Sequence, residues 1–482
     1  MVNVGEGYGR SRRTKIVCTL GPASSSAAVL REMVEAGMDV ARINFSHGSY
    51  ESNLELLEAV RETAEKAGRA VAILQDLQGP RIRVGQLPEG GLELIEGHLA
   101  TLVAGKLEAP EGEIPVPYER LAHDLKKGDR ILLEDGTKEL EVVDVRGKKI
   151  RAKVLLGGRL LAHKGINVPT AVLSVESLTQ KDEQDLAFGL KQDIDFVALS
   201  FVRGAADVRN LREKIKKFLP AGQAPPAVIV KIEKHEAIVN FEDILAETDG
   251  VMIARGDLGL ETPVSLLPLR QKQIITKCLA AGKPVIVATE MLGSMQHSPR
   301  PTRAEVTDVA NAVIDHTDAV MLSGETAMGR YPTRAVALMA EIAQETEESP
   351  LDDLPLPEEV KREPLPRAMA AAALTVARRV EAKAILVTTK SGFSARAMAA
   401  FRPEIPIYAA TEEVRTRNQL LMSWGVVPIL VEGYMEPEQM VRTMLAKMAK
   451  GHGLVKGDLI VVVSGLKRDK GGYDSALRVV GL

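Results

Sequence analysis

The chain has 482 residues, enough for about three domains, and its 45% apolar and 26% charged residues are typical of a globular protein. A net charge of −3 gives no argument for binding nucleic acid or an anionic membrane. The N-terminal residues lack the apolar core of a signal peptide and no apolar run is long enough to span a bilayer, so we expect a cytoplasmic enzyme. The two cysteines, Cys18 and Cys278, lie in apolar sequence and are predicted to be buried thiols.

Short runs of β-branched and aliphatic residues alternate along the chain with amphipathic stretches. The runs are Lys15–Leu20, Val40–Ser46, Val71–Leu77, Asp195–Val202, Val228–Glu233, Gly250–Ala254, Pro284–Thr289 and Ala319–Ser323. The amphipathic stretches include Ser52–Lys66, Ala205–Phe218 and Leu266–Ala281. Eight such alternations over about 250 residues favour an α/β fold with a closed (β/α)8 barrel of the TIM type over an open doubly wound sheet. No internal repeat is evident.

The alternation is interrupted at residues 84–175, where short alternating runs are separated by Gly and Pro. This pattern predicts a small β-barrel inserted into a loop of the main barrel. Such an insertion at the catalytic face is placed to act as a lid, and a passive decoration is the alternative.

A proline-rich linker at residues 349–357 precedes a third part of the chain. Its predicted strands are Ala384–Thr389, Ile405–Ala409, Val426–Val431 and Leu459–Val463, with helical segments between them. We therefore expect barrel residues at 1–83 and 176–348, a lid at 84–175, and a C-terminal α/β regulatory domain at 358–482.

Charged and hydroxyl side chains follow seven of the eight predicted barrel strands, at the end where barrel enzymes collect their catalytic groups. The most informative are Lys231 and Glu233, which lie two residues apart on one strand and so point the same way. With Asp257, which lies between glycines, they suit a divalent metal, a phosphoryl group and a developing enolate. A surface salt bridge is the alternative, but both segments end buried strands. The other polar ends are Arg42, Asn44 and Ser46; Asp76; Ser200 and Arg203; Thr289 and Glu290; Ser323 and Glu325.

These segments resemble the pyruvate kinase family over nearly the whole chain. The matching segments are Thr14–Ser24, Ala41–Gly48, Val230–Glu233, Ala254–Gly259, Ala288–Leu292, Pro301–Val306 and Met321–Ala327. The resemblance implies Mg²⁺-dependent phosphoryl transfer from phosphoenolpyruvate to ADP, giving pyruvate and ATP, as the final step of glycolysis. Mn²⁺ is an alternative metal.

The resemblance also implies roles for single residues. Lys231 would stabilise the transferring phosphoryl group and the enolate, and Glu233 and Asp257 would bind the metal. The backbone N–H groups of Gly256 and Asp257, together with Thr289, would receive the substrate carboxylate. Further implied residues are Arg42 on the phosphate; Thr289, Ser323 and Glu325 in the proton-relay region; and Pro22, Asn44, His47, Arg83 and Lys164 as nucleotide contacts. Which residue protonates the enolate stays open.

Two of these side chains have a second interpretation. A single histidine at a strand end usually has a structural role as a hydrogen-bonding residue. Only the surrounding family motif favours a nucleotide contact for His47. Arg255 either orients its own loop or contacts a neighbouring subunit.

One departure from the family pattern concerns a monovalent cation. Many members have a glutamate where this chain has Arg81, and their potassium site corresponds to Asn44, Ser46, Asp76 and the carbonyl of Leu77. Arg81 inverts the local charge, so we expect that K⁺ is not required. The alternative is that Arg81 turns to solvent and the site still takes K⁺.

The resemblance further implies a homotetramer with an allosteric site for a phosphorylated effector. The corresponding loop contains Thr389, Lys390, Ser391, Gly392, Phe393 and Ser394, and free N–H groups at a helix start bind phosphate. An ordinary helix cap by Ser391 or Ser394 is the alternative. A second glycine-rich loop, Gly465–Gly472, carries three cations, and Phe393 leaves the effector's identity open.

Two rival functions use the same residue types. A metal-dependent aldolase or lyase needs the metal and the enolate-binding groups, but not the nucleotide contacts or the lid. A non-catalytic sensor of sugar phosphates would tolerate the loss of Lys231, Glu233 or Asp257, and none of the three is lost.

Overall fold

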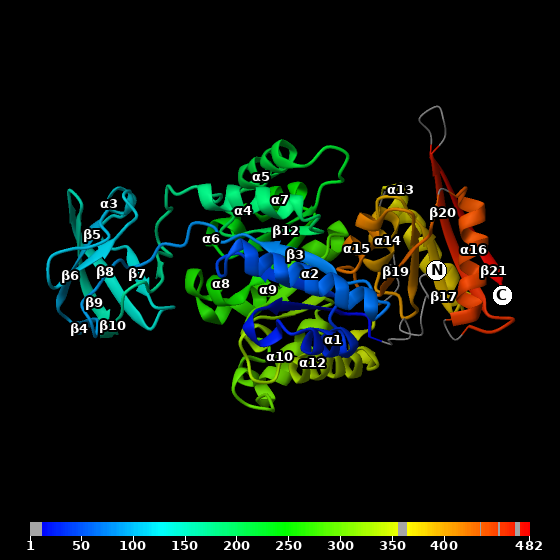
Figure 1. Ribbon diagram of the computed structural model, residues 1–482, viewed down its shortest axis with the longest axis horizontal. Helices are drawn as coiled ribbons and strands as arrows, with labels where there is room; N and C mark the ends of the chain where they lie inside the picture. The colour runs from blue at the N-terminus through cyan, green and yellow to red at the C-terminus, as the bar shows by residue number, and fades with distance from the viewer. Residues whose placement is uncertain (1–11, 355–363, 434, 452–453, 468–472) are drawn as a thin grey trace.

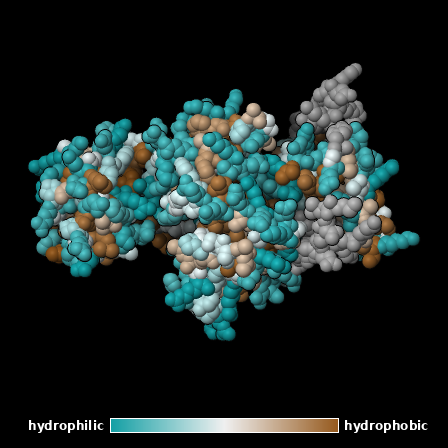
Figure 2. All heavy atoms as spheres, in the orientation of Figure 1, coloured by the Kyte–Doolittle hydropathy of each residue, from teal (hydrophilic) through white to brown (hydrophobic). Residues whose placement is uncertain are grey.

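The computed structural model describes residues 12–354, 364–433, 435–451, 454–467 and 473–482. Three parts lie in a row, with the barrel in the middle, the inserted all-β part at one end and the C-terminal part at the other (Figure 1). Hydrophilic side chains cover most of the face seen in Figure 2, and hydrophobic ones are dispersed in small groups. None of the helices described combines the length and the apolar character that crossing a membrane requires.

Eight parallel strands close into a barrel in the order β1-β16-β15-β14-β13-β12-β3-β2. Their bounds are β1 (Lys15–Leu20), β2 (Val40–Asn44), β3 (Ala72–Asp76), β12 (Phe196–Leu199), β13 (Ala227–Ile232), β14 (Gly250–Ala254), β15 (Val285–Ala288) and β16 (Ala319–Leu322). The closed ring confirms the predicted barrel. Strand β2 ends before the predicted Ser46 because the Asn44 side chain accepts the Ser46 N–H at 3.1 Å and turns the chain.

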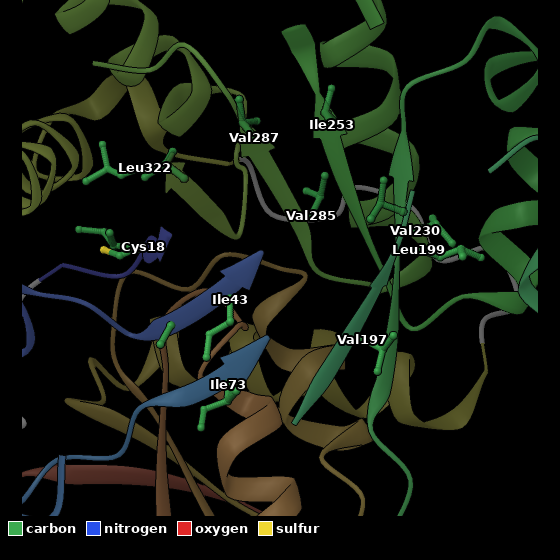
Figure 3. Close-up of a cluster of buried hydrophobic side chains, with 14 of the residues drawn as sticks. Cys18, Ile43, Ile73, Val197, Leu199, Val230, Ile253, Val285, Val287 and Leu322 are labelled. Carbon is green, nitrogen blue, oxygen red and sulfur yellow. The ribbon is translucent and has the colours of Figure 1, made fainter. Parts of the chain in front are cut away.

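The barrel strands alternate between two hydrophobic cores. Side chains such as Val230 and Ile253 point outward and pack under the surrounding helices, and Figure 3 shows this cluster with the buried thiol of Cys18. Intervening side chains such as Ile229 and Met252 fill the barrel interior. Both cysteines are buried and free, as predicted.

The helices of this part cover the barrel. They are α1 (Ala27–Ala36), α2 (Tyr50–Lys66), α4 (Gln180–Lys191), α5 (Ala205–Phe218), α6 (His235–Val239), α7 (Phe241–Glu247), α8 (Arg255–Glu261), α9 (Leu267–Ala281), α10 (Arg303–Ile314), α11 (Gly324–Ala327) and α12 (Pro332–Glu347). Short 3₁₀ turns occur at η1 (Pro22–Ser24), η2 (Val264–Leu266), η3 (Gly293–Gln296) and η4 (Pro350–Asp352). Helix α2 begins before the predicted Ser52, because Ser49 caps it by accepting the Ser52 N–H at 3.3 Å.

The insertion is all-β apart from α3 (Leu121–Asp124), in agreement with the prediction. Its strands are β4 (Leu92–Leu94), β5 (Leu99–Ala104), β6 (Glu113–Val116), β7 (Arg130–Leu133), β8 (Lys138–Arg146), β9 (Lys149–Leu156), β10 (Gly158–Leu160) and β11 (Ile166–Asn167). They are divided between a six-stranded sheet, β11-β7-β8-β9-β5-β6, and a two-stranded sheet, β10-β4. A separate hydrophobic core lies within this part, which we call the lid.

The C-terminal part has a mixed sheet in the order β19-β18-β17-β20-β21. Its elements are β17 (Ala384–Thr388), β18 (Ile407–Thr411), β19 (Val426–Leu430), β20 (Leu459–Lys467), β21 (Tyr473–Gly481), α13 (Leu365–Arg379), α14 (Phe393–Ala399), α15 (Val414–Leu420) and α16 (Pro437–Gly451). The four predicted strands are present. Strand β21 was not predicted; it pairs antiparallel with β20 along its whole length, and its sequence mixes Asp, Ser and Arg with apolar residues.

Candidate active site

The end of β13 directs a lysine and a glutamate into the barrel mouth. Ile229 faces the interior while Val230 and Ile232 pack outward, so the strand alternation turns Lys231 inward. Its Nζ lies 2.9 Å from Glu233 Oε1 and 3.4 Å from Asp76 Oδ1. It also donates a hydrogen bond of 2.8 Å to Ser200 Oγ. The ammonium group therefore sits between two buried carboxylates supplied by different strands.

Arg42 lies beside this cluster. Its Nε donates to Asp76 Oδ2 at 2.7 Å, and its Nη1 donates to Thr19 Oγ1 at 2.7 Å. Thr19 was missed by the sequence analysis, although a hydroxyl residue near the end of β1 completes the pattern of polar strand ends. The contacts hold one guanidinium and one ammonium group around the Asp76 carboxylate.

These charges shift one another's proton affinity. Burial disfavours the charged lysine, but the carboxylates of Asp76 and Glu233 outweigh it, so the pKa of Lys231 is raised. Burial acts in the same way on Asp76, yet Lys231 and Arg42 lower the pKa of that carboxyl group. Burial raises the pKa of Glu233, and the nearby charge of Asp257 adds to the effect against the opposing contact with Lys231. Glu233 thus lacks full compensation by positive charge.

The oxygen atoms of this cluster fit a divalent cation. Asp76 Oδ1 and Glu233 Oε1 are buried without a hydrogen bond, although both face the Lys231 ammonium group. Within the described residues there is no group of three or more His, Cys, Asp or Glu side chains that would hold a metal ion alone. Mg²⁺ commonly takes one or two carboxylates and completes its shell with water and phosphate oxygens, so Glu233 and Asp257 suit it.

The start of α8 contacts the end of β15. The Gly256 N–H donates to Thr289 Oγ1 at 2.8 Å, so the predicted carboxylate donor is engaged with another predicted site residue. Thr289 has a φ of +66° and Glu290 has a φ of +55°, a strained conformation that clusters at functional sites. Arg255 donates to the Thr289 carbonyl at 2.8 Å and to Asp308 Oδ1 at 2.8 Å. Within this chain, Arg255 therefore connects the start of α8 to the loop after β15 and to α10, and a contact with a neighbouring subunit stays a prediction.

Ser323 and Glu325 follow β16 as predicted. Glu325 is 1% exposed and accepts the N–H groups of Ser323 at 2.8 Å and Leu292 at 3.1 Å. The Ser323 hydroxyl is buried without a hydrogen-bond partner. Glu325 consequently joins the ends of two strands, while Ser323 keeps an unused polar atom.

A cavity of 220 Å³ lies between the barrel mouth and the lid. Arg83 and Lys164, two of the predicted nucleotide contacts, line it together with Arg81 and Asp257. Lys164 Nζ lies 2.8 Å from Glu134 Oε1, and Arg83 donates to the His163 carbonyl at 3.0 Å. The other three predicted contacts do not line this cavity; Pro22 begins η1, Asn44 ends β2, and His47 is exposed just beyond it.

Three of the four groups in the predicted monovalent-cation region make contacts within the protein. Asn44 Oδ1 accepts the Ser46 N–H, and the Leu77 carbonyl accepts the Ser200 hydroxyl at 2.8 Å. Asp76 binds Arg42 and Lys231, as described above. The Arg81 side chain is 42% exposed, and its Nη2 lies 3.1 Å from Asp257 Oδ1, so it is both open to solvent and in contact with the site.

The predicted effector loop connects β17 to α14. The Gly392 N–H donates to Thr389 Oγ1 at 3.0 Å, and the Lys390 carbonyl accepts the Thr416 hydroxyl at 2.8 Å. The helix cap is Gly392 with φ +77° and without a side-chain bond, so the alternative cap by Ser391 or Ser394 is wrong. A cavity of 450 Å³ is lined by Ser391, Phe393 and Ser394 among others. Residues 468–472 of the second predicted loop lie outside the described residues.

Comparisons with known proteins agree with this architecture. A family profile described as "Pyruvate kinase, barrel domain" matches residues 11–336, and one described as "Pyruvate kinase, alpha/beta domain" matches residues 367–480. "Pyruvate kinase 2" of Synechocystis sp. is 43% identical over 97% of this chain and 79% of its own length, and "Pyruvate kinase" of Staphylococcus aureus (strain MRSA252) is 39% identical over 97% and 80%. The crystal structure of a pyruvate kinase from Cryptosporidium parvum has a TM-score of 0.90 at 34% identity and covers 98% of this chain and 96% of its own. The chain therefore belongs to the pyruvate kinase family and is a kinase that transfers the phosphoryl group of phosphoenolpyruvate to ADP, giving pyruvate and ATP.

Proposed function

We propose that Lys231 carries the central charge of this phosphoryl transfer. The supporting observation is its ammonium group, held within 3.4 Å of two buried carboxylates at the mouth of the barrel. A fixed cation in a site that excludes water stabilises charge that develops in the transition state. Here that charge lies on the transferring phosphoryl group and on the enolate oxygen. Arg42 supplies a second fixed charge, because Thr19 and Asp76 hold its guanidinium group.

Glu233 and Asp257 are the proposed ligands of Mg²⁺, and Mn²⁺ has similar preferences. The metal, when bound, neutralises phosphate charge and polarises the oxygen atoms of the substrate. Glu233 Oε1, which has no hydrogen bond beyond its contact with Lys231, and the pKa of Glu233, raised by burial and by Asp257, support this assignment. The chain's own contribution is to hold both carboxylates beside Lys231.

Thr289 and the start of α8 are the proposed carboxylate-binding groups. In this geometry Thr289 Oγ1 accepts the Gly256 N–H, and a substrate carboxylate would take that donor in its place. The N–H groups of Gly256 and Asp257 would then both point at the anion. Ser323 is the proposed proton-relay group with a free polar atom, and Glu325 holds its backbone. Thr289, Ser323 and Glu325 all stay candidates for handing the proton to the enolate.

The proposed nucleotide site lies between the lid and the ends of barrel strands β1 and β2. Arg83 and Lys164 would contact phosphates from the lid side, and Pro22, Asn44 and His47 would contact the nucleotide from the ends of β1 and β2. Residues 84–175 then form a lid, residues 1–83 and 176–348 the barrel, and residues 358–482 a regulatory domain. Closure of the lid would exclude water from the reacting groups.

Arg81 is proposed to replace the monovalent cation that other members of the family recruit. Burial alone would lower the pKa of Arg81, but the charges of Asp257 and Glu233 raise it, so the guanidinium group stays charged beside the metal ligands. The groups that would bind K⁺ are Asn44, Ser46, Asp76 and the Leu77 carbonyl, and of these Asn44 Oδ1, Asp76 Oδ2 and the Leu77 carbonyl already have a partner in the protein.

A homotetramer controlled by a phosphorylated metabolite is proposed from the family and from the Thr389–Ser394 loop. The effector would enter the cavity lined by Ser391 and Ser394 and favour one quaternary state. Sedimentation would report the assembly, and titration with sugar phosphates and nucleotide monophosphates would report the control. Hyperbolic kinetics indifferent to all of them would contradict it. The site and its substrates also favour a cytoplasmic enzyme of glycolysis.

The test is pyruvate formation from phosphoenolpyruvate and ADP, followed in a coupled assay with and without Mg²⁺. We expect metal-dependent turnover that Asp257→Asn reduces at least tenfold, by analogy with the loss of other preorganised groups. The matched control is Asp243→Asn on the exposed face of α7, with unchanged turnover. Turnover without ADP would favour a lyase, and no turnover with retained effector binding would favour a sensor.

A further inference from the structure

Helix α8 has predicted site residues at one end and the lid at the other, and Figure 1 shows it on the side of the barrel that faces the lid. Gly256 and Asp257 lie in its first turn, and Leu260 and Glu261 lie in its last. A Cβ atom at Gly136, in the turn between β7 and β8 of the lid, would lie 3.2 Å from Leu260 Cδ2. The lid therefore packs closely on the far end of this helix.

Glu261 makes the polar contact at that end. It is 5% exposed, and its Oε1 accepts Asn167 Nδ2 of lid strand β11 at 3.4 Å. The same oxygen accepts the Lys234 ammonium group at 2.7 Å, and Lys234 directly follows Glu233. One buried carboxylate thus joins the lid, α8 and the end of β13. Because a buried carboxylate needs its partners, its environment depends on where the lid lies.

The other end of α8 also contacts the segment that leads into the lid. Arg81, on the path from β3 to the lid, lies 3.1 Å from Asp257. Between the two ends the helix is held as a unit, since Leu258 is fully buried and its carbonyl accepts the Thr262 hydroxyl at 2.9 Å. Seven residues of helix span about 10 Å, so a displacement at Glu261 is transmitted along the axis to Gly256.

We propose that Glu261 is a positioning residue that couples closure of the lid to α8. With the lid in the position seen here, Asn167 and the Gly136 turn lie against the end of α8 and fix the orientation of Gly256 and Asp257. The substrate carboxylate and the metal ligand are then aligned only when the lid is closed. Lid closure in other enzymes completes a catalytic site in the same sense. This inference rests on the proposed roles of Gly256 and Asp257.

The test is a double-mutant cycle between the two sides of the contact. Asn167→Ala removes the donor on the lid, and Glu261→Gln removes the charge on α8 while keeping the shape. We expect each to lower kcat about tenfold, because small misplacements of reacting groups cost this much or more. The double variant should be no slower than the slower single variant. Hydrogen exchange of residues 256–262 should quicken in Asn167→Ala, although the substitution lies in another part of the molecule, while exchange of β8 and β9 stays unchanged.

A matched control is Glu113→Gln, which removes an ion pair of 2.5 Å with Lys149 inside the lid. It should leave kcat and the exchange of α8 as in the parent. The proposal is overturned if Asn167→Ala keeps kcat within about twofold, if the two losses multiply, or if α8 exchange is unchanged. Failure of the proposed function can be told apart from failure of this proposal. If the proposed function is wrong, Asp257→Asn keeps full activity, whatever hydrogen exchange of α8 shows.

Discussion

The two ends of the barrel both carry acidic side chains, but they use them differently. At the end where the strands begin, one aspartate directly precedes every second strand of the barrel, which gives four in all. Each aspartate accepts the N–H of a residue at the start of the preceding barrel strand. The pairs are Asp39 with Ile16, Asp195 with Ile73, Asp249 with Val228 and Asp318 with Val285, at 2.8 to 3.1 Å. Each aspartate also has an arginine partner: Arg12, Arg415, Arg212 and Arg402, respectively. This fourfold repetition ties neighbouring strands in pairs.

At the end where the strands finish, the acids are left incomplete. Asp76 Oδ1 and Glu233 Oε1 both face the same ammonium group, that of Lys231, and have no further hydrogen bond, while Ser323 Oγ is buried without a hydrogen-bond partner. Buried polar atoms are nearly always satisfied in folded proteins, so the exceptions need an explanation. The comparison teaches that carboxylates bound by a backbone N–H group and an arginine hold neighbouring strands together, whereas Asp76 Oδ1 and Glu233 Oε1 depend on one shared cation, Lys231.

The largest effect is expected from a substitution at the end of the barrel where the strands finish, which we call the incomplete end. Lys231→Met removes the ammonium group between Asp76 and Glu233 and should abolish phosphoryl transfer, at a cost of about 3 kcal/mol or more in the transition state. The protein should stay folded, because Arg42 still binds Asp76, and because burial raises the pKa of Glu233 and so lets that carboxyl group take a proton once Lys231 is gone. The coupled assay and a melting curve check both parts. Activity within tenfold of the parent in a variant that melts normally would refute the role.

The reverse result is expected at the satisfied end. Asp318→Asn leaves the guanidinium group of Arg402, which is 1% exposed, without its charged partner. Breaking a buried pair in this way should lower the free energy of unfolding by about 3 kcal/mol. The folded fraction should keep the kcat of the parent. Denaturant unfolding measures the loss, and Glu62→Gln in an exposed pair with Lys66 is the control, expected to melt as the parent does.

The difference between the ends also shows what the sequence could predict. The eight strands were predictable because β-branched runs with helical stretches between them leave few alternatives. Lys231 and Glu233 were predictable as one site because strand alternation needs only their spacing. The fourfold repetition was not found in the sequence, since an aspartate before a strand looks like any loop residue. Its partner N–H groups come together only when the barrel closes.

Contacts between the lid and the barrel could not be predicted from the sequence, for a different reason. Asn167 and Glu261 lie 94 residues apart, and their contact depends on how the lid is oriented. The turn at Thr389–Ser394 was predicted from its glycine and hydroxyl residues, but the N-cap by Gly392 was not, because serine is the ordinary side-chain cap and two serines flank this position. Local pattern predicts elements, whereas contacts across domains need the assembled structure.

A smaller effect is expected from changing the charge at the incomplete end without removing a predicted ligand. Arg81→Glu replaces the guanidinium group beside Asp257 by a carboxylate and should create a potassium requirement. Like charges a few ångströms apart repel by several kcal/mol at an effective dielectric of about 20, which is why Arg81 disfavours bound K⁺. Turnover is measured at fixed ionic strength with tetramethylammonium as the only monovalent cation, and then with KCl. A hundredfold rise for the parent on adding K⁺ would show the idea wrong.

The smallest effect is expected outside the barrel, at Asp124 of the lid, whose carboxylate has hydrogen-bond partners for both oxygen atoms. Asp124 accepts the Ser174 N–H at 2.8 Å and also binds the hydroxyl groups of Ser174 and Tyr118. Burial alone would raise its pKa, but these hydrogen bonds outweigh it and lower the pKa of Asp124 to about 2. If satisfied carboxylates serve the fold, Asp124→Asn should reduce stability by about 1 kcal/mol at neutral pH and leave kcat unchanged.

The sign of the pH dependence follows from the lowered pKa. The folded protein binds the Asp124 proton more weakly than the unfolded chain, whose value is near 3.8. The stabilisation is therefore complete above about pH 4 and is lost as the pH falls towards about 2. Melting curves of the parent and of Asp124→Asn should differ at neutral pH and converge in this acid range. A difference in melting temperature that persists at pH 2 would mean that Asp124 acts through packing. A loss of kcat in Asp124→Asn would contradict the idea that a fully hydrogen-bonded carboxylate serves only the fold.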